Sequence, residues 1–210
     1  MTEAEWAACR DPRELFDYHR MKRDPRRLRL LAVACARLIP PTSLPPQLGS
    51  VIDVAERFAD GAATRAEFLA ARRLVRAAGR RTNDFTQGHR VLMWLADDSL
   101  EGQSMAITVT RDLTGPAGAA AECDLNRCVF GNPYRAVAFD PAWRTEAAVG
   151  LASGIAADRA FERLPVLADA LEDAGCADPD VLGHCRGGGP HATGCWVVDG
   201  LSGKLPQSGM

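Results

Sequence analysis

The sequence predicts an all-α fold, a single domain over residues 1–210 built from roughly eight to ten short helices. Apolar residues recur at steps of three and four along most of the chain, which is the period of one helix face. Helix-start signals also recur, because an Asp precedes a Pro at Asp11, Asp24, Asp140 and Asp178. The Asp side chain accepts hydrogen bonds from free backbone N–H groups, and proline at the first helical position sacrifices no hydrogen bond.

Composition places the chain among ordinary globular proteins. Its 210 residues are 47% apolar and 25% charged, with a formal net charge of −2, which suits a chain with a full-sized core and argues against disorder. Seven cysteines scattered through helical patterns favour reduced thiols or metal ligands over a disulfide framework. No stretch approaches the roughly 20 apolar residues that cross a bilayer, and the first residues are acidic. We expect a cytoplasmic protein without a membrane partner.

Charge is unevenly distributed along the chain. Residues 1–100 carry 17 Lys and Arg against 13 Asp and Glu, and residues 101–210 carry 8 against 14. The basic excess comes from residues 20–29 and 72–81. We expect these arginines to lie on solvated helix faces, with a surface for an acidic partner as the alternative. Tight binding of DNA or RNA needs a concentrated basic surface, so we expect no nucleic-acid partner.

The first half of the chain contains several helix signals in order. Thr2 and Glu5 have capping-box spacing, and a second helix begins at Asp11. The helix after Asp24 carries one apolar stripe, and the prolines of 40–47 end it. That stripe consists of Leu28, Leu31, Ala32, Cys35, Leu38 and Ile39. A helix over 50–61 ends at Gly61.

The middle of the chain gives less uniform signals. A helix begins near Thr64, with Glu67 in the capping-box position, and ends at Gly79. Residues 90–100 have helical spacing, whereas the β-branched stretch 105–113 fits either a strand or a helix turn. Residues 115–130 predict a helix that begins at Pro116 and carries Cys123 and Cys128, both expected in the core.

The second half begins with an aromatic loop over residues 130–143, which contains Phe130, Tyr134, Phe139 and Trp143. We expect it to pack down as an ordered strap between helices, with a ligand-binding surface as the alternative. One helix then follows Thr145, and another over residues 164–174 ends at Gly175. From residue 164 to 204 we expect a C-terminal subregion organised around Cys and His residues, with a short helix after Asp178 and helical spacing again from Gly194.

Four residues of this subregion have metal-ligand spacing: Cys176, Cys185, His191 and Cys195. Four such ligands within 20 residues, joined by a glycine-rich hinge, suffice for tetrahedral zinc. The spacing equals that of the CCCH zinc finger with the last two ligand types exchanged. His184 is adjacent to Cys185, and neighbours on a helix point about 100° apart, so only one of them faces a shared metal. Arg186 could offset the net charge of −1 that three thiolates and one imidazole give a zinc site.

Three interpretations of this cluster remain open. In the first, the cysteines are small buried core residues and the histidines cap carbonyls near helix ends. In the second, the cluster is a structural zinc site. In the third, either Cys185 or Cys195 is a catalytic thiol. The RNA-binding role of CCCH fingers does not carry over, because the interval lacks aromatic residues between the ligands.

Three blocks of the chain resemble an uncharacterised protein family that is multiplied in planctomycete bacteria. The blocks are TEAEWAACRDP (2–12), FGNPYR with DPAW (130–143), and LPVLADALEDAGC followed by LGHCRGGGPHATGCWVVD (164–199). They occur in the family's order and cover both ends of the chain better than its middle. The resemblance implies no activity, cofactor or catalytic residue.

For function, we expect a non-enzymatic interaction or regulatory module with a protein partner and a structural zinc site. The sequence has no phosphate loop, paired-carboxylate helix motif or nucleophile elbow. The alternative is a metal-dependent hydrolase or thiol enzyme that uses the Cys/His cluster at 176–195. An open coordination position separates the two, because structural zinc sites are closed by four protein ligands.

Overall fold

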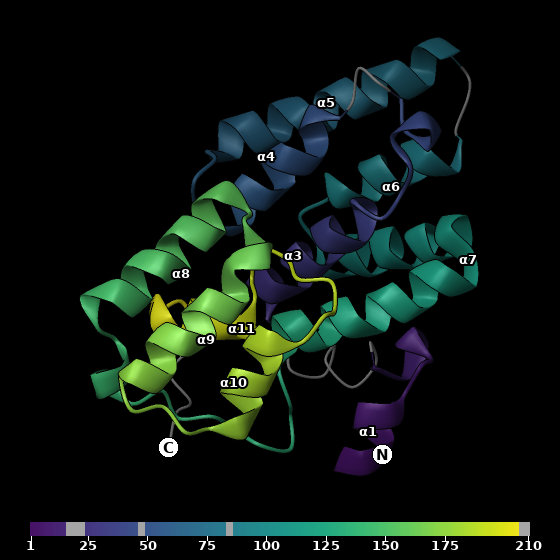
Figure 1. Cartoon of the computed structure of the whole chain (residues 1–210). Coiled ribbons are helices and arrows are strands. Elements are labelled where there is room, and N and C mark those ends of the chain that lie inside the picture. The colour runs from purple at the N-terminus through teal and green to yellow at the C-terminus, as the bar shows by residue number, and fades with distance from the viewer. Residues whose placement is uncertain (16–23, 46–48, 83–85, 206–210) are drawn as a thin grey trace. The chain divides into compact units, whose positions relative to one another are not determined.

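The structure, a computed structural model, describes residues 1–15, 24–45, 49–82 and 86–205 (Figure 1). Within these ranges every regular element is a helix and no strand occurs, so the all-α prediction is confirmed. The α-helices are α1 (Glu3–Ala8), α3 (Pro25–Ala36), α4 (Ser50–Ala59), α5 (Arg65–Thr82), α6 (Gln87–Leu95), α7 (Leu100–Phe130), α8 (Glu146–Asp158), α9 (Leu164–Asp173), α10 (Pro179–Arg186) and α11 (Trp196–Leu201). None of the helices in the described ranges has the length and apolar character needed to cross a membrane.

Contacts divide the chain into two compact units, Met1–Asn126 and Arg127–Met210. The C-terminal subregion expected over residues 164–204 lies inside the second unit, which begins earlier, at Arg127. The predicted helix start at Asp11 is present as a helical turn over residues 12–15, and the chain beyond it to residue 23 lies outside the described residues.

In the first unit the core is built around α3. Asp24 caps this helix by accepting a hydrogen bond from the backbone N–H of Arg27 at 3.0 Å, as the Asp-Pro pair predicts. Of the predicted stripe, Leu28, Leu31, Ala32, Cys35 and Ile39 are buried. The remaining α3 residues from Leu28 to Ala36 are buried as well, so the helix is enclosed on all sides and packs against α4 and α6.

Two helix ends differ from the prediction. The capping box of α5 is present, with the backbone N–H of Thr64 donating to Glu67 and that of Glu67 donating to Thr64. However, α5 continues past Gly79 to Thr82, because one glycine inside a helix costs only about 1 kcal/mol and does not by itself end it. Helix α6 ends at Leu95, short of the predicted 90–100, because the side chain of Asp97 accepts hydrogen bonds from Ser99 at the start of α7.

The ambiguous stretch 105–113 is helical and belongs to α7. Hydroxyl side chains within this stretch and on either side of it donate to backbone carbonyls four residues earlier, which satisfies their polar atoms within the helix. These bonds run from Ser104 to Leu100 (2.8 Å), Thr108 to Ser104 (3.0 Å), Thr110 to Ala106 (2.9 Å) and Thr114 to Thr110 (3.1 Å). Tertiary burial of Ile107 and Val109 outweighs the low helix propensity of β-branched residues.

Helix α7 is kinked at Gly115, where φ is 61° and ψ is −158°. Pro116 follows and begins the second arm, as predicted. The guanidinium of Arg111 donates two hydrogen bonds to the carboxylate of Glu122, at 3.0 and 2.5 Å. Eleven residues span about 16 Å along a straight helix, so this buried pair can form only because the two arms fold back toward each other at the kink.

The basic segments of the first unit are only partly solvated. Arg73, Arg76 and Arg80 are exposed, as expected for the second segment. Arg29 of the first segment is instead buried, 5% exposed, with its guanidinium over the rings of Phe58 and Phe68 and a hydrogen bond of 3.1 Å to Asp98. Stacking on aromatic rings compensates the guanidinium for lost water. Residues 20–23 of this segment lie outside the described residues.

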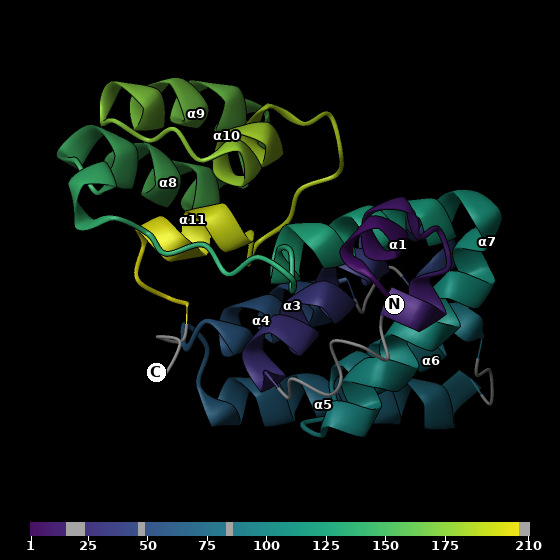
Figure 2. The same ribbon diagram turned by 90° about the horizontal axis from the view of Figure 1, so that it is seen from below.

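The second unit consists of α8 to α11 and the last turn of α7 around one apolar core (Figure 2). Helix α9 contacts both α8 and α10, and α11 contacts α8 and α10. Leu164, Leu167, Ala168 and Leu171 of α9, the predicted stripe, are fully buried. Helix α11 is buried along its whole length.

The strap predicted over 130–143 is present in part: Phe139 and Trp143 pack against the core of the second unit, whereas Tyr134 is exposed. Phe139 contacts the rings of Trp143 and Trp196 edge to face, with centroids 6.2 and 5.9 Å apart. Its ring also fills the space beside Gly200, where a Cβ atom would lie 2.2 Å from the ring. Gly131 starts the strap at a φ of 69° with the ring of Trp196 against it. The strap therefore contacts α11 through packed aromatic rings.

Candidate metal centre

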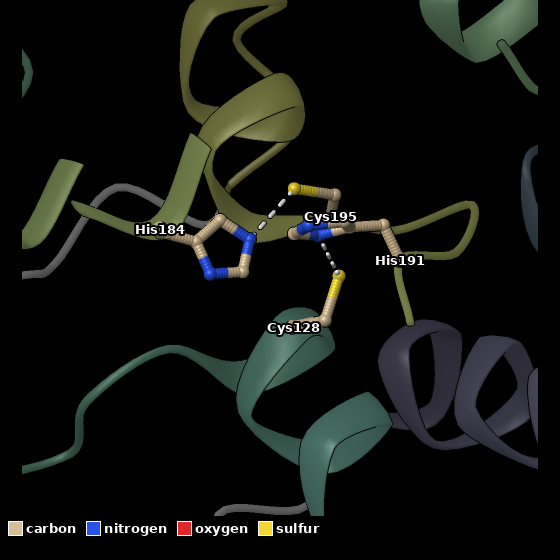
Figure 3. Close-up of side chains that lie close together, drawn as sticks. All are labelled: Cys128, His184, His191 and Cys195. Atoms are coloured by element: carbon tan, nitrogen blue, oxygen red, sulfur yellow. Dashed lines mark hydrogen bonds between the residues drawn. The ribbon is translucent and has the colours of Figure 1, made fainter. Parts of the chain in front are cut away.

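Four potential metal ligands lie together in the second unit: Cys128, His184, His191 and Cys195 (Figure 3). Cys128 lies in the last turn of α7, His184 on α10, His191 in the loop after α10, and Cys195 at the N-cap of α11. One ligand atom of each residue lies within 4.8 Å of all the others. Tertiary folding therefore brings two thiols and two imidazoles from four separate segments to one point.

Two distances between these atoms can be compared with those of a tetrahedral site. Nε2 of His184 lies 3.3 Å from Sγ of Cys195, and Nδ1 of His191 lies 3.6 Å from Sγ of Cys128. In a tetrahedral site with zinc–sulfur bonds near 2.3 Å and zinc–nitrogen bonds near 2.0–2.1 Å, a sulfur and a nitrogen ligand lie about 3.6 Å apart. These two sulfur–nitrogen distances are close to that value, and the remaining pairs of ligand atoms lie within 4.8 Å.

The second nitrogen of His191 is also held. Its Nε2 lies 3.3 Å from the carbonyl oxygen of Gly187, so an Nε2–H donates there while Nδ1 faces the cluster. Ligating histidines commonly donate their other ring N–H to a carbonyl or carboxylate, which fixes the tautomer and orients the ring. The rings of His184 and His191 meet edge to face, with centroids 4.9 Å apart. The imidazoles are therefore oriented before any metal binds.

Burial differs between the sulfur and nitrogen ligands. The Cys128 and Cys195 side chains are 1% and 0% exposed, whereas both histidines are half-buried. The thiols thus lie on the inner side of the site and the imidazoles on its outer edge. A closed, largely buried tetrahedral site is the arrangement found for structural zinc.

The pKa values of the Cys128 and Cys195 thiols are shifted in opposite directions. Burial alone would raise the pKa of Cys195, but a hydrogen bond from Cys128, the charge of His184 and hydrogen bonds with His184 and His191 hold it well below its usual value. The hydrogen bond to Cys195, together with burial, raises the pKa of Cys128 well above its usual value. A lowered pKa at Cys195 favours its thiolate, the form in which a cysteine binds a metal.

Local sequence explains how the loop between the ligands closes. Residues 187–189 are three glycines, and all three are exposed. Gly194 has a φ of 91°, in the left-handed region that favours glycine, and it precedes Cys195. The loop can therefore turn sharply enough to return His191 and Cys195 to the helix that carries His184.

The structure assembles a different set of ligands from the one that the spacing predicted. His191 and Cys195 are in the cluster, but Cys176 and Cys185 are not. Both of the latter are buried in the apolar core of the second unit, at 3% and 0% exposure. Burial raises the pKa of Cys185 to about 12, so its thiol stays protonated in this core.

Sequence reasoning missed two members of the cluster. His184 and Cys185 are neighbours on α10, and the helix turns Cys185 toward the core and His184 toward the cluster. Cys128 was expected in the core with Cys123, and both are indeed buried. Its place beside His191 arises from tertiary folding, and no local spacing signals it. The only sequence signal for His184 was its position next to Cys185, because only one of these two neighbours can face a shared metal.

Arg186 does not offset charge at the cluster. Its guanidinium donates instead to the carboxylates of Glu172 and Asp169, which joins α10 to α9. Two thiolates and two neutral imidazoles around a divalent cation would have no net charge, so this set of potential ligands would need no such compensation.

Comparison of the chain with protein-family models, curated proteins and solved structures found no match. The resemblance to the planctomycete family therefore stays a prediction, and the functional argument rests on the geometry of the cluster.

Proposed function

We propose that Cys128, His184, His191 and Cys195 hold one structural zinc ion, and that the protein is a zinc-stabilised helical module that acts by binding a partner rather than by catalysis. The observation that carries this proposal is the convergence of four ligand atoms within 4.8 Å, with two sulfur–nitrogen distances of 3.3 and 3.6 Å.

The chemistry of the ligand set favours zinc among the divalent metals. Two thiolates with two imidazoles form a soft, tetrahedral donor set, which is typical of zinc and unsuited to magnesium or calcium, whose ligands are oxygens. No carboxylate belongs to the group found among the described residues. A thiolate pair also lowers the charge of the ion where it is buried, and burial of an uncompensated charge would be costly.

The closed arrangement favours a structural role over a catalytic one. Four protein ligands fill a tetrahedral site, whereas catalytic zinc keeps one position for water or substrate. The sulfur of Cys195, the candidate thiol nucleophile, is fully buried, so a substrate could not reach it in this conformation. A metal-dependent hydrolase or a thiol enzyme would each need an opening that the cluster does not offer.

A metal at this position would stabilise the second unit by linking segments that lie far apart in the sequence. Cys128 ends α7, His184 lies on α10 and Cys195 begins α11. Anything that binds only the folded state adds to its stability by mass action. In this proposal the ion fixes the helices of the second unit, and the module presents its surface to a protein partner.

Metal analysis of the protein, purified without added metal, tests the proposal. We expect roughly one zinc per chain, as for a closed four-ligand site. Cys128→Ser should lose the zinc, whereas the matched control Cys123→Ser, which removes another buried thiol from the same arm of α7, should keep it. Protein that carries no metal and does not take up zinc under reducing conditions would refute the structural zinc site.

A further inference from the structure

We propose that Cys128 and Cys195 are a redox pair: a peroxide converts these two thiols into a disulfide, and the disulfide and the zinc ion exclude each other. The release of zinc in this inference rests on the proposed function. Formation of the disulfide does not, because it can be tested in the metal-free protein.

Geometry singles out this pair among the thiols of the second unit. The Sγ atoms of Cys128 and Cys195 lie within 4.8 Å of each other, whereas Cys176 and Cys185 are outside the cluster. A disulfide bond needs about 2.0 Å between the sulfurs, so a shift of a few ångströms is enough. Gly194, with a φ of 91°, directly precedes Cys195, and three further glycines lie at 187–189 in the same loop, so the backbone next to Cys195 has the freedom that glycine gives.

The same atoms serve either state, so the two states compete. A zinc ion requires both sulfurs as thiolates, at ligand distance from one centre. A disulfide removes both negative charges and draws the sulfurs together, which leaves two imidazoles as the only ligands. Two histidines alone hold zinc far more weakly than a closed four-ligand site, so oxidation of the pair should release the ion.

The reaction balances in two steps with hydrogen peroxide as the oxidant. One thiolate attacks the peroxide oxygen, the O–O bond breaks, and sulfenic acid forms while hydroxide leaves and takes up a proton as water. The second thiol then attacks the sulfenic sulfur, the S–O bond breaks, the S–S bond forms, and a second water leaves. Two electrons pass from the two sulfurs to one peroxide.

Access to the sulfurs depends on the outer edge of the site. Both sulfurs are buried, and the half-buried imidazoles of His184 and His191 lie between them and solvent. His191 belongs to the exposed glycine loop, so local opening of that loop would uncover Cys128 and Cys195 together. Bound zinc holds His191 in place, and we therefore expect zinc to slow the oxidation of both thiols.

The experiment treats the full chain with hydrogen peroxide in two forms, zinc-loaded and chelator-stripped. Zinc content is measured first, released zinc is followed with a colorimetric chelator, and disulfides are mapped by mass spectrometry of peptides prepared without reductant. We expect a Cys128–Cys195 disulfide in the stripped protein, and in the zinc-loaded protein the same disulfide, at least about tenfold more slowly, with one zinc released per disulfide. Dithiothreitol followed by zinc should restore the starting metal content.

Two variants serve as controls. Cys185→Ser, which removes the neighbouring core thiol, should leave the Cys128–Cys195 disulfide unchanged, and Cys9→Ser should leave zinc release unchanged. The inference is overturned if Cys128 and Cys195 stay reduced in the stripped protein while Cys9, a partly exposed thiol, is oxidised. It is also overturned if the mapped disulfide joins any other pair. Absence of zinc before treatment would contradict the proposed function alone, because the stripped arm still tests the disulfide.

Discussion

Cys195 shows how much a single residue of this protein depends on its neighbours. It is fully buried, it caps the start of α11, and it lies 3.3 Å from an imidazole nitrogen of His184. Cys185, the residue next to His184 on α10, is buried in the apolar core instead. The two cysteines therefore have different surroundings, and only Cys195 lies beside the imidazoles of His184 and His191.

At this scale we predict opposite results for two substitutions of the same kind. Cys195→Ser should lower the affinity for zinc by more than about 100-fold, which exceeds the 10–100-fold cost of changing an outer-shell partner. Cys185→Ser should leave zinc affinity within about threefold of the wild type and reduce only the free energy of unfolding, since it places a hydroxyl in apolar core. Competition titration with a chromogenic chelator measures both affinities. Equal losses in the two variants would favour the ligand set that the spacing predicted.

At the scale of elements, close packing and helix caps determine where each helix lies. Helix α11 passes so close to Phe139 that residue 200 has no room for a side chain. Helix α5 begins at a reciprocal pair of hydrogen bonds between Thr64 and Glu67. Both features follow from single residues and can be tested one at a time.

Gly200→Ala should destabilise the protein by about 1–3 kcal/mol, the usual cost of overpacking a filled core. The new Cβ atom would lie 2.2 Å from the ring of Phe139. Gly150→Ala is the matched control, because no atom lies within 4 Å of a Cβ atom built there, and it should raise stability by up to about 1 kcal/mol. Urea unfolding measures both. A neutral Gly200→Ala would mean that α11 is not held against the strap.

The pKa of Glu67 tests the cap of α5. Hydrogen bonds from the backbone and side chain of Thr64, and then from Arg57, lower this pKa to about 2. Because the folded pKa lies below the unfolded value of about 4.3, the cap stabilises the fold above pH 4.3, and this contribution is lost as the pH falls toward 2. Titration of the Glu67 carboxyl by NMR should give a midpoint near 2, and Thr64→Ala should move it back toward 4.3. A midpoint near 4 in the unaltered protein would rule out the cap.

At the scale of the whole molecule, the sequence predicted most helices but only two of the four residues in the Cys/His cluster. The helical spacing of apolar residues and the Asp-Pro pairs predicted α3, α9 and α10, because both signals are local properties of the sequence. Local spacing could not show that Gly115 folds α7 back on itself, or that Cys128 meets His191, because these depend on contacts between distant segments. Of the four residues that the spacing predicted, His191 and Cys195 belong to the group of potential ligands that the structure brings together, and Cys176 and Cys185 do not.

Removal of the metal should affect the two compact units differently. If zinc binds as proposed, its ligands would link α10 and α11 to the end of α7, and residues 176–204 have few large apolar side chains to replace that link. We expect a chelator to increase amide hydrogen exchange in residues 176–204 by at least about tenfold, while exchange in α3 stays unchanged. Equal changes in both units would indicate global unfolding rather than local loosening around a metal.

The central claim is the identity of the four ligands, and X-ray absorption at the zinc edge tests it most directly. The cluster of Cys128, His184, His191 and Cys195 predicts two sulfur neighbours near 2.3 Å and two imidazole nitrogens near 2.0–2.1 Å, with no further oxygen ligand. A spectrum with three sulfurs and one nitrogen would contradict the account, since that is the signature of Cys176, Cys185, His191 and Cys195. A bound water would contradict the closed, structural site.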